Sequence, residues 1–244
     1  MERVRIGIAG LDELLNGGIP KSSQVFLVGG PGTGKTMMGI EYLYRGAKNG
    51  ETGLFFSLEE EPAWIIRNVE STFSEWKDFR GLVDSGKIQI AGHESYIHLE
   101  KAVAPGQGGA QYAFSKVLSS IQSLITNNGV TRVTIDSATV IKMFFESDLE
   151  FRRTLLNLLK SLKKLNCTTL ITDEFPSLER GNLIFAAEHF VADGLLMLYN
   201  LQQQEKRLSA VEVLKMRSTA HSKALTPLKI TSAGINVYVG EKVY

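Results

Sequence analysis

The sequence predicts an α/β fold, in which a mainly parallel central sheet is flanked by helices and followed by a C-terminal antiparallel β extension. Up to residue 174, apolar strand-like runs alternate with helical periodicity, the order typical of parallel strands joined by crossover helices. After residue 193, short polar turns separate strand-like runs, which is typical of antiparallel strands. Because 244 residues that are 43% hydrophobic suffice for one core, we expect a single domain over residues 1–244.

The first half of the chain contains five expected elements. Apolar runs predict strands at 23–30, 52–58 and 87–92, and helical periodicity predicts helices at 36–50 and within 62–76. In the second helix, apolar residues recur at three- and four-residue spacing. The residues of this core-facing stripe are Ile65, Ile66, Val69, Phe73 and Trp76. Residues 93–111 are Gly-rich and unpatterned, so we expect an exposed loop there.

The second half continues the alternation and then changes. A helix near 111–127 precedes a strand at 132–137, and a helix at 149–166 precedes a strand at 167–174. Strands at 194–202, 207–217 and 227–240 are assigned to the antiparallel extension, the last with a turn at 232–234. These elements complete the predicted sheet.

Composition excludes several classes of protein. The 27 Lys and Arg residues against 26 Asp and Glu residues leave a charge of +1, so no global field attracts nucleic acid or an acidic membrane. Cys167 is the single cysteine, which rules out a disulfide framework and indicates a small core residue. No stretch approaches the roughly 18 apolar residues of a spanning helix. We therefore expect a soluble cytoplasmic protein with no membrane contact.

The segment GGPGTGKT follows an apolar strand and precedes a helix, the context in which the G-x-x-x-x-G-K-[ST] pattern binds phosphate. Glycines let consecutive backbone N–H groups converge on phosphate oxygens, and the positive end of the helix dipole lies behind them. Lys35 would bridge the β and γ phosphates, and Thr36 would ligate Mg²⁺. A plain Gly-Pro-Gly turn would not need Lys-Thr at this offset. The predicted nucleotide contacts are Gly29, Gly30, Pro31, Gly32, Thr33, Gly34, Lys35, Thr36 and Met37.

A second candidate site lies in VTIDS, where Asp136 ends a buried strand. An acid in this position can hold the hydration shell of Mg²⁺. A strand-terminal Asp is more often a helix cap or turn residue, but the phosphate loop elsewhere in the chain favours a metal role here. Ser137 is a neighbour in the same shell.

Three carboxylates follow the strand in LFFSLEEEP. Ligands of a parallel sheet bind beyond the carboxyl ends of its strands, so Glu59 and Glu60 would face the γ phosphate and orient the attacking water. Alternatively, these acids open the following helix, where negative charge is favoured and Pro62 suits the first turn. We assign that structural role to Glu61 and the catalytic role to Glu59 or Glu60.

The segments GLDELLNGGIP, GGPGTGKT, FFSLEEEP, VTIDS and VLKMRSTAHSK, in this order and spacing, resemble the KaiC branch of the RecA-like P-loop ATPases. The resemblance covers nearly the whole chain and implies a RecA-like P-loop fold in a single-domain, KaiC-like protein of the archaeal kind. In this family, two adjacent glutamates act on the attacking water, and they match Glu59 and Glu60. A family segment that reaches the nucleotide of the adjacent subunit in a hexameric ring matches Lys215, Arg217, Thr219 and His221.

The spacing of Lys215 and Arg217 supports in part the role in the adjacent subunit that the resemblance implies. Lys215 and Arg217 are two apart on a predicted strand, so both would project from one face and neutralise charge on a γ phosphate supplied in trans. A solvated strand face is the alternative. Ser218 stands where the family usually has Gly, a departure that bears on how closely this turn approaches nucleotide. The chain has one ATPase core where the clock protein has two, so circadian activity is not implied.

The leading hypothesis is a slow Mg²⁺-dependent ATPase that forms rings and regulates an unidentified partner through its ATP or ADP state. DNA binding is an alternative, because residues 201–244 carry seven basic and three acidic side chains. Autokinase activity and a nucleotide-gated binding module without turnover are further alternatives. Three histidines lack metal-ligand spacing and are interpreted as ordinary polar or core residues: His93, His98 and His189.

Overall fold

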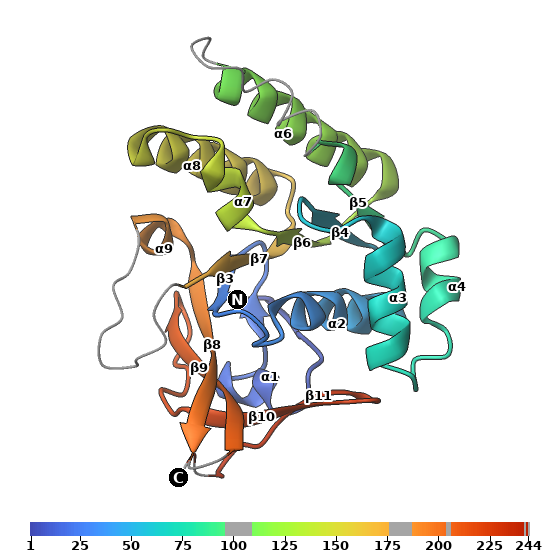
Figure 1. The fold of residues 1–244 in the computed structure, drawn as a ribbon, viewed down its shortest axis with the longest axis vertical. Helices are drawn as coiled ribbons and strands as arrows, with labels where there is room; N and C mark the ends of the chain where they lie inside the picture. Colours follow the sequence, from blue (N-terminus) through green and yellow to red (C-terminus); the bar gives the residue numbers. More distant parts are fainter. Residues whose placement is uncertain (96–108, 176–186, 204–205, 242, 244) are drawn as a thin grey trace.

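A large twisted sheet runs through the middle of the protein in the computed structural model (Figure 1). The structure describes residues 1–95, 109–175, 187–203, 206–241 and 243. The described residues form a nine-stranded sheet with the strand order β11-β10-β9-β8-β3-β7-β6-β4-β5, and β1 pairs with β2 in a separate two-stranded sheet. The α/β architecture with a mainly parallel sheet is therefore confirmed.

The first half of the chain contains the predicted strands and helices, together with short additional elements near its start and the unpredicted helix α4 before β5. Its elements are β1 (Arg3–Val4), α1 (Leu11–Leu14), β2 (Ile19–Pro20), β3 (Gln24–Gly29), α2 (Lys35–Lys48), β4 (Gly53–Ser57), α3 (Pro62–Thr72), α4 (Phe79–Asp84) and β5 (Ile88–Ala91). All five residues of the predicted apolar stripe are buried, three of them on α3 and two just beyond its end. This stripe is thus part of the core.

The second half of the chain begins with α6. Its elements are α6 (Gly109–Asn128), β6 (Arg132–Asp136), α7 (Ala138–Met143), α8 (Asp148–Lys164), β7 (Thr168–Glu174), α9 (Ala187–Val191), β8 (Gly194–Gln203), β9 (Lys206–Met216), β10 (Thr226–Thr231) and β11 (Gly234–Val237). The predicted loop at 93–111 is shorter than expected at both ends, since residues 93–95 are helical and α6 already begins at 109. The rest of that prediction, with His98, lies outside the described residues.

Strand direction changes at β8. The strands from β3 through β7, β6 and β4 to β5 are parallel, whereas β9, β10 and β11 are antiparallel to their neighbours. We assigned the strand at 194–202 to the antiparallel extension. It is antiparallel to β9 but parallel to β3, with which it pairs from Val25↔Gly194 to Gly29↔Leu198. β8 therefore joins the two parts of the sheet.

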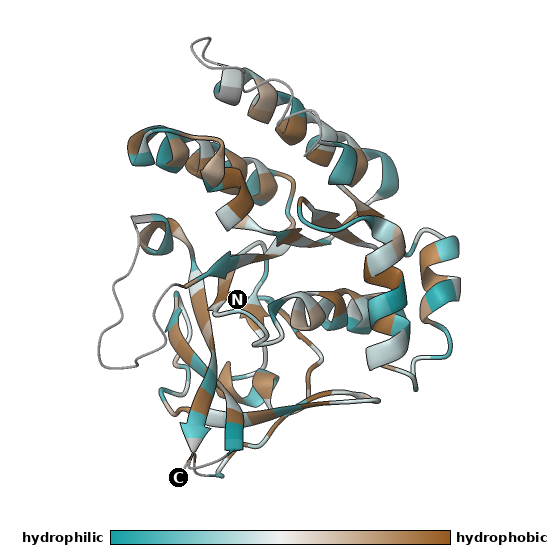
Figure 2. Ribbon diagram, in the orientation of Figure 1, coloured by the Kyte–Doolittle hydropathy of each residue, from teal (hydrophilic) through white to brown (hydrophobic). Residues whose placement is uncertain are grey.

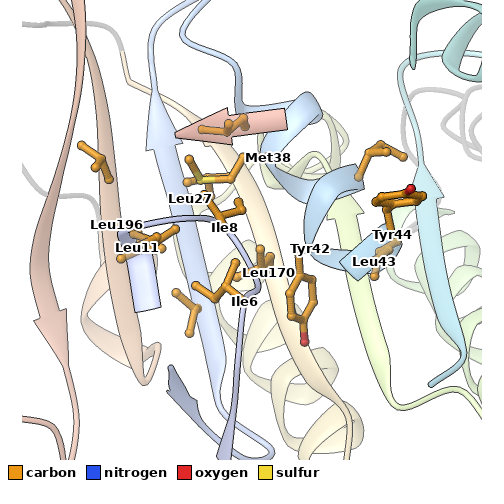
Figure 3. Packing of buried hydrophobic residues seen from close by; sticks show 14 of the residues in the cluster. Ile6, Ile8, Leu11, Leu27, Met38, Tyr42, Leu43, Tyr44, Leu170 and Leu196 are labelled. Atoms are coloured by element: carbon orange, nitrogen blue, oxygen red, sulfur yellow. The ribbon is translucent and has the colours of Figure 1, made fainter. Parts of the chain in front are cut away.

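Each face of the sheet carries its own hydrophobic core. One core joins the N-terminal segment, α2, α3 and α4 to the sheet, and the other joins α6, α7 and α8 to the opposite face. All six residues of β3 are buried, as expected for a central parallel strand covered on both sides. Figure 2 shows the hydrophobic residues along these strands. Figure 3 shows Leu27 of β3 near Ile8 and Met38, and Leu170 of β7 near Ile6.

Two predictions about composition can be compared with the structure. Cys167 is fully buried, which confirms the interpretation of this residue as part of the core. Within the described part of the chain, no helix is both long enough and apolar enough to cross a membrane.

Candidate nucleotide site

The phosphate loop joins the carboxyl end of β3 to the amino end of α2, as predicted. Gly32 and Gly34 have φ angles of 70° and 95°, a region that glycine enters without steric cost. A Cβ atom on Gly34 would lie 2.8 Å from the end of the Ile230 side chain on β10, so another residue at this position would also require Ile230 to shift. A Cβ atom on Gly32 would meet nothing within 4 Å. The loop is therefore open on the Gly32 side.

Backbone donors are available along this loop. The N–H groups of Gly32, Thr33 and Gly34 donate to no acceptor within the described residues. Side chains brace the loop, because Thr33 Oγ1 donates to the Gly30 carbonyl at 2.8 Å and Asn200 Nδ2 donates to the Gly32 carbonyl at 3.2 Å. With the positive end of the α2 dipole behind it, this arrangement fits a phosphate group.

Lys35 begins α2, and its ammonium group folds back over the loop. Nζ donates to the carbonyl oxygens of Gly29 and Gly30, at 2.8 and 3.1 Å. A phosphate is a stronger partner for an ammonium group than a neutral carbonyl, so this contact can be exchanged when nucleotide binds. Of the other predicted contacts, Pro31 is exposed at the loop tip, and Met37 is half-buried against the core.

Asp136 lies at the end of β6 and contacts Thr36 on α2. Thr36 Oγ1 donates to Asp136 Oδ2 at 2.9 Å, and Thr172 Oγ1 on β7 donates to Oδ1. Burial raises the pKa of Asp136 to about 6, the Thr172 hydrogen bond opposes that rise, and the charge of Glu59 adds to it. A hydroxyl and a carboxylate are oxygen ligands of the kind that Mg²⁺ takes. Their meeting beside the phosphate loop fits the predicted metal role.

The capping role that a strand-terminal acid often takes is performed by Ser137. Ser137 is the N-cap residue of α7, and its Oγ accepts a hydrogen bond from the Val140 N–H at 3.4 Å. The same hydroxyl donates to the carboxylate of Glu59. Asp136 is thus not the cap of this helix, and its carboxylate contacts Thr36 and Thr172 instead.

Glu59 and Glu60 follow β4, the strand beside β6. Ser57 Oγ accepts hydrogen bonds from the N–H groups of Glu59 and Glu60, at 3.3 and 3.0 Å, and so holds the turn. The carboxylate of Glu59 accepts from Ser137, whereas that of Glu60 accepts from Asn68 on α3 at 3.2 Å. Glu59 is therefore directed toward the end of β6, and Glu60 toward α3.

Glu61 has the structural place that the sequence predicts. It is the N-cap residue of α3, and Pro62 is the first residue of that helix. Its side chain makes no capping hydrogen bond, and the carboxylate lies 3.6 Å from Nε2 of His93. This contact joins residues 59–61 to the segment that follows β5.

Lys215 and Arg217 do not lie at the phosphate loop of their own chain. Lys215 pairs with Leu195 in β8, and Leu195 pairs with Phe26 in β3. The phosphate loop begins further along β3, at Gly29. β9 runs antiparallel to β8 and so leads away from the loop. The N–H group of Arg217 donates to the carbonyl of Asp193, the residue before β8 begins. The two basic residues therefore lie toward the opposite end of the sheet.

The contacts of these two residues differ. Lys215 Nζ donates to the carbonyl oxygens of Phe190 and Ala192, at 3.0 and 2.6 Å, beyond the middle of α9. Burial lowers the pKa of Lys215, and the neighbouring charge of Arg217 lowers it further. Arg217 is exposed and lies 3.6 Å from the carboxylate of Asp193. A solvated strand face thus describes Arg217 better than Lys215.

Thr219 and His221 follow in the same irregular segment. Thr219 Oγ1 accepts a hydrogen bond from Arg3 on β1 at 3.1 Å, and Nδ1 of His221 lies 2.9 Å from the Ser222 carbonyl. Ser218, just before them, has a φ angle of 57°, which is the left-handed region that favours glycine. The turn therefore keeps the backbone conformation of a glycine although a serine occupies it.

Four residues that sequence reasoning missed support these segments. Thr172 holds Asp136, Asn200 holds the phosphate loop, Ile230 packs on Gly34, and Arg3 holds the 218–219 turn. None of them lies within a recognisable motif. Each contact joins segments far apart in sequence, so tertiary structure alone brings these residues together.

The sequence matches the ATPase family described as KaiC over residues 4–242, which is nearly the whole chain. The chain belongs to the KaiC family of ATPases. Nucleotide binding of the ATPase type is therefore its family-level function.

Similar KaiC-family proteins come from archaea and cyanobacteria. The UPF0273 protein MK0039 of Methanopyrus kandleri is 36% identical over 97% of this chain and 92% of its own length. The circadian clock oscillator protein KaiC of Picosynechococcus is 33% identical over 98% of this chain, which spans 45% of that protein. The crystal structure of the KaiC-like protein PH0186 from Pyrococcus horikoshii has a TM-score of 0.80 and 32% identity, covering 97% of this chain and 99% of the other.

Proposed function

We propose that this KaiC-family chain binds ATP with Mg²⁺ and hydrolyses it slowly, and that the nucleotide controls assembly of a ring that regulates a partner. The observation that carries the proposal is the convergence of Thr36, Asp136 and Glu59 beside an open phosphate loop. These residues belong to α2, to β6 and to the segment after β4. Their convergence combines phosphate binding, metal binding and water activation in one place.

Nucleotide binding depends on the loop. Its free N–H groups and the ammonium of Lys35 would hold the phosphates, and Thr36 with Asp136 would hold Mg²⁺, directly and through water respectively. The metal would neutralise charge on the phosphate oxygens. The hydrogen bond from Thr172 holds one oxygen of the Asp136 carboxylate while Thr36 holds the other, and the two bonds together orient this carboxylate.

Water activation is assigned to Glu59, with Glu60 as the second candidate. The Glu59 carboxylate is held by Ser137, next to Asp136, and can accept a proton from a water that attacks the γ phosphate. Both glutamates are exposed, but the carboxylate of Glu60 bonds to Asn68 on α3 rather than to Ser137. We infer that Glu59 has the larger catalytic effect.

Lys215 and Arg217 would act in trans. Because they lie toward the opposite end of the sheet from the loop of their own chain, the γ phosphate that they neutralise would belong to a neighbouring subunit. This proposal requires a head-to-tail ring, in which each chain offers one end of its sheet to the other end of the next. Six subunits is the ring size that the KaiC resemblance implies.

The proposal concerns one ATPase domain. The name of the Picosynechococcus relative refers to a circadian clock, but this chain spans less than half of that protein. Clock activity is therefore not part of the proposed function.

The proposal is tested by measuring the steady-state rate of ATP hydrolysis with Mg²⁺ over a wide range of protein concentration. The native chain, Glu59→Gln and Glu60→Gln are each measured separately. Glu59→Gln should lower kcat at least about 100-fold while the KM for ATP changes little, because removal of a general base costs 10²–10⁴ in rate. Glu70→Gln is the matched control, since Glu70 is an exposed residue of α3 that pairs with Arg80. This control should leave kcat unchanged.

Three other outcomes would revise the proposal. Full activity in both glutamine variants would remove the assignment of water activation to this cluster. A specific activity that stays constant across the range in which the protein assembles would confine catalysis to one chain and exclude Lys215 and Arg217. No turnover at any concentration, with ATP bound, would indicate a nucleotide-gated binding module.

A further inference from the structure

The short helix α9 is held to the rest of the protein by two buried polar side chains. Nε2 of His189 lies 2.9 Å from Oδ2 of Asp173, and the carboxylate of Glu188 lies 3.2 Å from Nζ of Lys142. His189 also packs edge-on against the ring of Phe26, with ring centroids 5.6 Å apart. A helix of five residues has no stability of its own in water, so these contacts determine where α9 lies.

Both partners of α9 belong to elements that form the nucleotide site. Asp173 follows Thr172, whose hydroxyl donates to Asp136, so the two acids are linked by one hydrogen bond and one peptide unit. Oδ1 of Asp173 accepts from Thr139 Oγ1 at 2.8 Å, and Thr139 lies in the first turn of α7, two residues after Ser137. The position of α9 is therefore set by residues adjacent to the metal and water-activating groups.

The other end of α9 holds Lys215. The ammonium group is 2.6 Å from the Ala192 carbonyl, 3.0 Å from that of Phe190 and 3.5 Å from that of His189. Lys215 therefore has its place defined by the carboxyl end of this helix. A shift of α9 relative to β7 would move the carbonyl oxygens and, with them, the ammonium group.

We propose that His189 is a positioning residue, which acts through its hydrogen bond to Asp173 to place the carboxyl end of α9 and hence Lys215. The proposed path is a series of contacts. Its first part joins Asp136 to Thr172, and the neighbouring Asp173 to His189 on α9. Its second part joins the carbonyl oxygens at the end of α9 to Lys215. The whole path joins the nucleotide site of one chain to the group that the same chain offers to the next. The catalytic consequence rests on the proposed function, whereas the placement of Lys215 does not.

The first experiment measures placement without catalysis. Lysine is labelled with ¹³C and ¹⁵N, and the ε-carbon signal of Lys215, assigned with Lys215→Arg, is followed by NMR in the full chain. His189→Leu fills the same space but cannot bond to Asp173, so the signal should move toward those of exposed lysines. His189→Gln should restore it, because its amide N–H can donate to Asp173.

Tyr199→Phe is the matched control for this measurement. It removes a buried side-chain hydrogen bond of 3.0 Å, to Glu212 on β9, and leaves the pair of His189 and Asp173 in place. It should leave the Lys215 signal in place. If His189→Leu does not fold, Asp173→Ser replaces it, because a serine side chain is too short to reach His189. An unchanged Lys215 signal in the folded variant would overturn the proposal.

The second experiment separates effects in trans from effects in cis. Subunits carrying Glu59→Gln and Glu60→Gln have an inactive site but an intact Lys215, and they are mixed with Lys215→Ala subunits, whose own site is intact. Hydrolysis by the mixture then reports Lys215 of the inactive subunits. Adding His189→Leu to those subunits should lower this activity about tenfold, since misplacement of a catalytic group by about 1 Å costs up to 10²-fold. His189→Gln should recover most of it.

The two experiments distinguish the possible failures. A mixture without activity even before His189 is changed would contradict the trans role of Lys215, and the NMR result would still decide the placement. Native mass spectrometry would show whether mixed rings form. If they form and His189→Leu leaves their rate of ATP hydrolysis unchanged, the proposed path is overturned.

Discussion

Ser218 occupies a backbone conformation that residues with a Cβ atom rarely adopt. Its φ angle is 57°, and its carbonyl accepts a hydrogen bond from Arg3 at 3.4 Å. The left-handed conformation costs a non-glycine residue roughly 1–2 kcal/mol. Because Arg3 also donates to Thr219, the turn that follows Lys215 and Arg217 is held from the N-terminal strand. Ser218 therefore adopts a backbone conformation that glycine enters without steric cost.

A pair of substitutions tests this interpretation. Ser218→Gly should leave the free energy of unfolding within about 1 kcal/mol of the native value, because relief of strain is offset by the greater entropy of the unfolded chain. Ser218→Val should lower it by about 1–3 kcal/mol, since a β-branched residue is strained at positive φ. Urea denaturation measures both. ATP hydrolysis should be similar in Ser218→Gly, and a several-fold gain would mean that the serine hinders the approach to nucleotide.

At the scale of elements, the β10–β11 hairpin supports the phosphate loop through α2. Glu41 of α2 is fully buried, and its carboxylate accepts hydrogen bonds from the Ile235 N–H at 2.7 Å and from Arg45. Trp76 Nε1 donates to the Ala233 carbonyl at the hairpin tip. Since Ile230 on β10 packs against Gly34, the hairpin ties the C-terminal part of the chain to the loop.

Replacement of Glu41 by Gln should destabilise the protein. A glutamine amide presents one acceptor and one donor, so one of the donors on Arg45 or Ile235 loses its acceptor, at a cost of about 1–3 kcal/mol. Burial raises the pKa of Glu41 above its ordinary value of 4.5, against the hydrogen bonds from Arg45 and Ile235. The native protein thus binds this proton more tightly than the unfolded chain, and the contribution of Glu41 to stability falls as pH rises from 4.5 through the raised pKa.

Urea denaturation at several pH values checks this expectation. The loss of stability in Glu41→Gln should be larger near pH 4.5 than near pH 8. Glu70→Gln, in which the exposed pair with Arg80 is broken, should leave the midpoint unchanged at both pH values. A loss that is independent of pH would show that the Glu41 proton is not linked to folding.

At the scale of the whole molecule, the two groups of proposed catalytic residues lie toward opposite ends of the sheet. The phosphate loop, Asp136 and Glu59 follow the carboxyl ends of β3, β6 and β4, whereas Arg217 lies beside the residue that precedes β8. If both groups act in catalysis as proposed, each chain contributes to two sites, which is the arrangement expected of a closed ring rather than of a functional monomer.

Nucleotide and metal should consequently control the size of the assembly. In sedimentation velocity, ATP with Mg²⁺ should shift the protein to a larger species, and EDTA should reverse the shift. Lys35→Ala should stay small under both conditions, because it loses the ammonium that binds the phosphates. An assembly of the same mass with and without nucleotide would separate ring formation from ATP binding and would contradict this part of the proposal.

Local sequence patterns were sufficient for most of the fold and for the core of the site. The alternation of strands and helices, the GGPGTGKT loop, Asp136 at a strand end and Glu61 at a helix start are all properties of short segments. The predictions were wrong or incomplete where contacts between segments far apart in sequence determine the structure. Examples are the direction of β8 relative to β3 and the bond from Thr172 to Asp136.

The sequence by itself determined the proposed phosphate and metal ligands and the start of α3, because these features depend on residue types at fixed local spacing. The tertiary structure alone decided that the Glu59 carboxylate bonds to Ser137, that Lys215 is bound to the carboxyl end of α9, and that the basic segment lies away from the phosphate loop of its own chain. The physical reason is that these properties depend on strand order and direction, and hydrogen bonds between β6 and β7 or between β9 and α9 leave no signal in either segment alone.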